Sequence, residues 1–109
     1  MAYDENLAAR IADLLTGTPD IEERKMFGGV GYMLKGNMAC GVHKDFLIVR
    51  VGPEKFQEAL DDPHTKVFDI TGRPMTGWVM VASRGFESDA DLGRWIDQGV
   101  SFAKSLPSK

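Results

Sequence analysis

The residues most suggestive of chemistry lie in one glycine-rich stretch, MFGGVGYMLKGNMACGV at positions 26–42, which holds five of the chain's 12 glycines. Such a stretch could cradle a phosphate, but a P-loop requires Lys-Ser or Lys-Thr after its last glycine, and no such pair follows. A dinucleotide loop that starts at Gly29 and Gly31 would need a third glycine where the chain has Leu34. Both loops also open a helix, whereas YMLKGN is typical of a strand and a turn. We therefore expect these glycines to serve the backbone, with a bend or bulge at Gly28-Gly29 and a turn at Gly36.

The remaining reactive side chains do not combine into a site. Cys40 and His43 have half of a zinc-like spacing, but in an extended strand side chains three apart point to opposite faces. Ser83 lacks the G-x-S-x-G turn of a nucleophile, and the neighbouring carboxylates at positions 61 and 62 would diverge on a helix. We expect no catalytic residue, no metal site and no cofactor.

The bulk properties indicate one ordinary domain. A length of 109 residues suits a single domain over 1–109, and a net charge of -3 argues against a general polyanion binder. The charge is uneven, because residues 24–84 hold nine basic and six acidic side chains. Apolar runs are too short to span a bilayer, and a single cysteine suits a reducing compartment. We expect a cytoplasmic protein without membrane contact.

Three segments have the apolar spacing of helices. The first covers residues 4–15 and has one apolar stripe: Leu7, Ile11, Leu14 and Leu15. A short helix should follow Gly52-Pro53 and end at Pro63, and a long one should start after Ser88 as N-cap and run to near residue 106. Gly99 lies inside the last helix, where it either weakens the helix by about 1 kcal/mol relative to alanine or marks a close contact.

The segments between these helices are predicted strands, at residues 21–27, 30–34, 38–42, 46–51, 67–70 and 78–83. Lys35-Gly36-Asn37 should join two of them as a hairpin, since Gly and Asn tolerate a positive φ. The order predicts an α+β domain, with helices packed on a mainly antiparallel sheet.

Two of these strands carry large apolar side chains on both faces. Phe46 and Ile48 oppose Leu47, Val49 and Val51 in one strand, and Trp78 with Met80 opposes Val79 and Val81 in the other. A sheet with helices on one side should alternate apolar with polar residues. Helices therefore cover both faces, or a second chain or ligand covers one of them. We predict a homodimer with contacts at or near Phe46, Ile48, Trp78 and Met80; the competing account places the N-terminal helix over that face.

The runs RKMFGGVGYMLKGNMACGV, DFLIVRV before GPEKFQEAL, and HTKVFDITGRPMTGWVMV before a long helix together resemble the N-terminal domain family of TfoX/Sxy, the bacterial competence regulators. The resemblance covers about residues 21–106 and centres on MFGG and on Gly77-Trp78. It implies a fold similar to type III secretion chaperones, with three helices against a five- or six-stranded antiparallel sheet, and a role in regulating competence genes. Full-length regulators carry a second, helical domain; this chain ends at Lys109 without one, so we expect a stand-alone N-domain.

We expect a non-enzymatic interaction or regulatory module that acts through protein contacts. Its candidate surface combines motif residues with the two-faced strands: Lys25, Met26, Phe27, Gly28, Gly29, Phe46, Ile48, Arg73, Trp78 and Met80. One alternative is weak nucleic-acid binding through the central basic residues, with Phe27, Trp78 and Phe86 nearby. The other is a small-molecule-binding domain or enzyme of unknown type.

Overall fold

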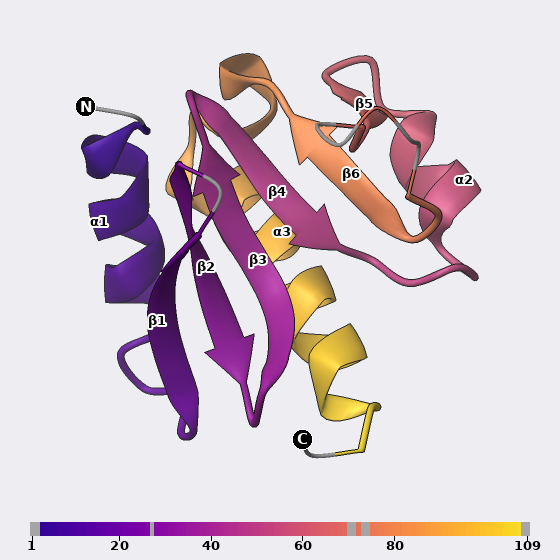
Figure 1. The fold of residues 1–109 in the computed structure, drawn as a ribbon. Helices are drawn as coiled ribbons and strands as arrows, with labels where there is room; N and C mark the ends of the chain where they lie inside the picture. Colours follow the sequence, from indigo (N-terminus) through magenta and orange to yellow (C-terminus); the bar gives the residue numbers. More distant parts are fainter. Residues whose placement is uncertain (1–2, 27, 70–71, 73–74, 108–109) are drawn as a thin grey trace.

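The computed structural model describes residues 3–26, 28–69, 72 and 75–107. Its strands form one antiparallel sheet in the order β1-β2-β3-β4-β6-β5 (Figure 1). The strands are β1 (Ile21–Met26), β2 (Gly29–Leu34), β3 (Asn37–His43), β4 (Phe46–Arg50), β5 (Thr65–Val67) and β6 (Trp78–Val81). The helices are α1 (Glu5–Leu14), α2 (Phe56–Leu60), α3 (Asp89–Lys104) and the short 3-10 helix η1 (Ser83–Phe86). The predicted α+β class, with three α-helices on a five- or six-stranded sheet, is confirmed.

The central hairpin forms where the sequence predicts it, with one change in the turn. Lys35 and Gly36 take the positive φ values, 50° and 86°, whereas Asn37 already belongs to β3. The Asn37 side chain is buried, and its Nδ2 donates to the Pro107 carbonyl at 2.8 Å. The amide thus holds the end of the chain after α3 against the hairpin.

Several boundaries differ from the prediction, and three elements differ most. Helix α2 begins at Phe56 rather than directly after Gly52-Pro53, because Gly52 has a φ of 88° and residues 53–55 form a turn. Strand β5 covers Thr65–Val67 and so shares only Val67 with the predicted range 67–70. The Thr65 hydroxyl donates to the carbonyls of Ala59 and Asp62, both at 2.8 Å, at the end of α2. The segment after Val81 leaves the sheet and forms η1 instead of continuing the strand to residue 83.

All three α-helices pack on the same face of the sheet. The core joins Leu7, Ile11 and Leu15 of the α1 region to buried side chains of α3 and of the central strands. The Tyr32 hydroxyl of β2 donates to the Ala8 carbonyl of α1 at 3.0 Å, which ties this helix to the sheet. The competing account, in which the N-terminal helix covers the opposite face, is therefore wrong. Leu14 is also not part of the buried stripe, since 42% of it is exposed.

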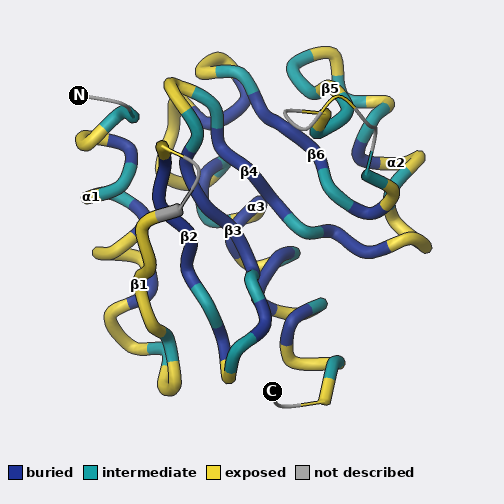
Figure 2. The backbone as a smooth tube through the Cα atoms, viewed as in Figure 1, coloured by how far each residue is buried: buried dark blue, intermediate teal, exposed yellow. Residues whose placement is uncertain are grey.

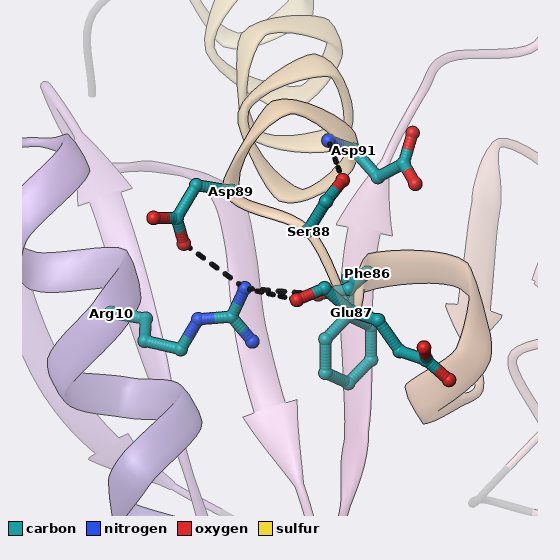
Figure 3. Close-up of polar contacts among 6 residues, drawn as sticks. All are labelled: Arg10, Phe86, Glu87, Ser88, Asp89 and Asp91. Carbon is teal, nitrogen blue, oxygen red and sulfur yellow. Dashed lines mark hydrogen bonds and ion pairs between the residues drawn. The ribbon is translucent and has the colours of Figure 1, made fainter.

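The start of α3 is held by α1 (Figure 3). One guanidinium nitrogen of Arg10 donates to the carbonyls of Phe86 and Glu87, at 3.0 and 3.3 Å, and pairs with Asp89 at 3.2 Å. Ser88 caps the helix as predicted, because its Oγ accepts from the Asp91 amide at 3.0 Å. Among the described residues, no helix is long and apolar enough to cross a membrane.

Candidate functional site

The side of the sheet away from the helices, here called the helix-free face, gathers four of the candidate residues. Ile48 lies opposite Met80, and Arg50 lies opposite Trp78, across the β4–β6 pair. Phe46 shares the face with Ile48 because side chains alternate along a strand. The predicted division of both strands into two apolar faces is confirmed.

The middle of the helix-free face is already closed within one chain. Ile48 is 2% exposed and Met80 is 4% exposed, although neither belongs to the main core cluster. Gly41, which is paired with Ile48, leaves room for the Met38 thioether: its Cε lies 2.7 Å from where a Gly41 Cβ would be. In Figure 2 the central strands are largely buried, while β1 at the edge of the sheet is exposed.

Two cations lie over aromatic rings on this face. The Lys66 Nζ is 4.7 Å from the centre of the Phe46 ring, and the Arg50 Cζ is 5.1 Å from the Trp78 ring. Arg50 also lies 5.3 Å from Phe102 of α3. Aromatic and arginine side chains are enriched at protein interfaces. The helix-free face therefore has a closed apolar centre and a partly exposed rim of ring and cation pairs.

The glycine pair of the MFGG motif serves the backbone, as the sequence predicts. Gly28 has a φ of 74°, and a Cβ on Gly29 would lie 2.1 Å from the carbonyl oxygen of Val42 in the neighbouring strand. Lys25 is exposed on the edge strand β1, which ends at Met26. Phe27 and Arg73 lie outside the described residues.

Gly77-Trp78 combines a backbone role with a surface role. Gly77 has a φ of 92°, and its carbonyl accepts from the amides of Val51 and Gly52 at 2.8 and 3.0 Å. This closes the end of β4 against β6 and places the Trp78 ring on the helix-free face, 5.9 Å from that of Phe68.

The structure thus divides the candidate surface in two. Phe46, Ile48, Trp78 and Met80 lie together on β4 and β6, whereas Lys25, Met26 and the glycine pair lie around the β1–β2 connection, with β3 between the two groups. Sequence reasoning missed Lys66, whose pairing with Met80 places it on the same face. Side chains alternate between the two faces along a strand, and this alternation in the short strand β5 is the signal that could have placed Lys66 on the helix-free face.

The polar groups inside the domain are positioned for stability. Burial raises the pKa of the Cys40 thiol to about 12, and burial together with the Glu23 carboxylate raises the pKa of Tyr32. Cys40 pairs with Val49 on the helix-covered face, whereas His43 pairs with Phe46, so the two side chains cannot share an ion. Within the described ranges, no three His, Cys, Asp or Glu side chains gather as metal ligands.

One comparison with known proteins is informative. The family described as TfoX N-terminal domain matches residues 13–103, which is most of the chain. Neither the curated proteins nor the solved structures gave a significant match. The family match agrees with the motifs at MFGG and Gly77-Trp78, and in general terms it supports a regulatory module of the competence type. The chain belongs to the TfoX N-terminal domain family.

Proposed function

We propose that this chain is a non-enzymatic interaction module, which acts through protein contacts in competence or transcriptional regulation in the bacterial cytoplasm. The observation that supports it is the helix-free face, where Phe46 and Trp78 are partly exposed beside Lys66 and Arg50. A buried free thiol at Cys40 suits a reducing compartment.

The first partner in this proposal is a second copy of the chain. A two-fold pair is the commonest way for a soluble protein to cover one patch with the same patch. The long side chains of Lys66 and Arg50 lie along the rings of their own chain, so their charged ends can stay at the rim of the contact. Ile48 and Met80 lie beneath the contact surface and would not touch the second chain, because both are buried within one chain.

Sedimentation equilibrium of the protein and of Phe46→Glu tests the dimer. The unmodified chain should have twice its mass of 12.0 kDa at tens of micromolar concentration. Fully burying a phenylalanine is worth about 1.5–3 kcal/mol, so Phe46→Glu should weaken the pair at least about tenfold. The new carboxylate would lie beside Lys66, so the fold should persist.

Leu14→Glu is the matched control, because Leu14 is a large exposed apolar side chain on α1, away from the helix-free face. It should leave the dimer unchanged. Ile48→Asp is unsuitable, since it would bury a charge inside the chain. A mass near 12.0 kDa for the unmodified chain, or equal effects of Phe46→Glu and Leu14→Glu, would contradict the dimer.

A second candidate function, weak binding of single-stranded nucleic acid, is favoured by the same ring and cation pairs. Bases stack on aromatic side chains of sheets, and cations contact the phosphates. Trp78 is partly exposed, although Arg50 and Phe68 already lie against its ring. Phe86 cannot stack on a base, since it is 4% exposed on the helix-covered side. We expect no binding tighter than the micromolar range that is typical of non-specific contacts. A salt-sensitive, nanomolar gel shift on promoter DNA would contradict this expectation and would favour specific nucleic-acid binding over the interaction module.

A further inference from the structure

A groove on the helix-covered side is not used by the proposed dimer. It has a volume of about 890 Å³ and lies between the α2 region and the C-terminal half of α3. Among the residues that the structure describes, its lining comes from the ranges 51–62 and 94–105, and none of these lining residues belongs to a strand. Small side chains line part of it: Ala59, Ser101 and Ser105.

The floor of this groove is apolar and rigid. Trp95 is 6% exposed, and its Nε1 donates to the Gly85 carbonyl at 3.2 Å, which fixes the ring. Phe102 packs against Gly52, where a Cβ would lie 2.5 Å from the ring. Val51 completes the floor. Rings fixed in this way can receive an apolar side chain at little cost in conformational entropy.

The rim of the groove is acidic. Glu58 lines the groove from α2, Glu54 from the turn before this helix and Asp62 from the segment after it, while Asp97 lines the groove from α3. Among the described residues the lining also holds two cations, Lys55 and Arg94, so the four carboxylates outnumber the cations by two. Arg94 pairs with Asp91 on its own helix.

We propose that this groove binds a cationic amphipathic helix of another protein. Apolar side chains of the helix would contact Trp95 and Phe102, while lysine or arginine would face Glu54, Glu58 and Asp97. The lining of α3 spans residues 94–105, or about 16 Å, which matches about three helical turns. An extended peptide fits less well, because the groove contains no strand edge to satisfy its backbone groups.

The test uses a fluorescein-labelled synthetic peptide of about 12 residues, with leucine on one face and lysine on the other. Fluorescence anisotropy should show saturable binding, and the Trp95 indole signal in an NMR spectrum should shift. A peptide with glutamate in place of lysine should not bind, because the rim is acidic. Glu58→Lys should weaken binding of the cationic peptide at least about tenfold.

Asp13→Lys is the matched control, since Asp13 is also exposed and helical, lies outside the groove and changes the net charge equally. Asp13→Lys should alter the affinity for the cationic peptide by less than about twofold. A larger loss in Glu58→Lys would then come from a local contact in the groove and not from the net charge of the protein. Ser101→Trp should fill the groove and abolish binding without a change in charge, whereas Ala9→Trp on α1 should not.

The proposal is independent of the dimer, so the peptide should also bind the Phe46→Glu protein. Three outcomes would overturn it: no saturable binding of the cationic peptide, equal losses in Glu58→Lys and Asp13→Lys, or NMR shifts confined to the helix-free face.

Discussion

Replacing Gly99 by alanine is expected to lower the free energy of unfolding by about 2–3 kcal/mol, although alanine is the better helix former. A Cβ at this position of α3 would lie 2.2 Å from the carbonyl oxygen of Ala39 and 3.0 Å from its carbonyl carbon. Because these atoms belong to the β3 backbone, the helix itself must move away from the sheet. That movement would loosen the packing of neighbouring core residues such as Val49.

Gly93→Ala is the matched control within the same helix. Outside the helix's own backbone, no atom of the described residues lies within 4 Å of a Cβ at Gly93, so this change should raise the stability by about 0.5–1 kcal/mol. Urea unfolding of both variants measures the two effects. If Gly99→Ala proved as stabilising as Gly93→Ala, the close packing of α3 on β3 would be wrong.

Replacing Gly29 by alanine is expected to cost about 3 kcal/mol, because the new Cβ would lie 2.1 Å from the Val42 oxygen. The pairing of β2 with β3 would have to open at this end of the sheet. Amide hydrogen exchange should therefore show reduced protection around Val30 and Val42. This outcome would assign the second glycine of the MFGG motif to the fold rather than to a binding surface.

Gly17→Ala serves as the comparison for this variant. In the part of the chain that the structure describes, a Cβ at Gly17, just after α1, meets no atom within 4 Å, so the stability should change by no more than about 0.5–1 kcal/mol. Normal stability and normal exchange in Gly29→Ala would instead favour a surface role for the motif glycine.

The period of the apolar residues was enough to predict the long helix, the central hairpin and the two faces of β4 and β6. It could not predict which elements cover each face, because that depends on contacts far apart in sequence, such as that of Tyr32 with Ala8. It also missed η1 and the early start of β5, which depend on local hydrogen bonds, including that of Thr65 with Ala59.

The candidate surface was predicted only in part, for a related reason. Large apolar side chains at Ile48 and Met80 indicated an exposed patch, but both are buried within one chain, and the Met38 Cε lies beside Gly41, the residue paired with Ile48. Lys66 and Arg50 lie over the rings of Phe46 and Trp78 because the strand register brings them to the same face, and the period of a single strand does not reveal that register. The groove between α2 and α3 joins residues about 40 positions apart, so no local pattern could reveal it.

The central claim is that the helix-free face of the sheet is the surface through which the chain associates. Isotope-filtered NMR on an equal mixture of labelled and unlabelled protein measures it most directly, because it detects only contacts between different chains. We predict intermolecular contacts from the ring protons of Phe46 and Trp78, and none from Leu14. Intermolecular contacts confined to the helix-covered side would contradict the claim. So would the absence of any intermolecular contact, together with a mass that remains at the 12.0 kDa of a single chain.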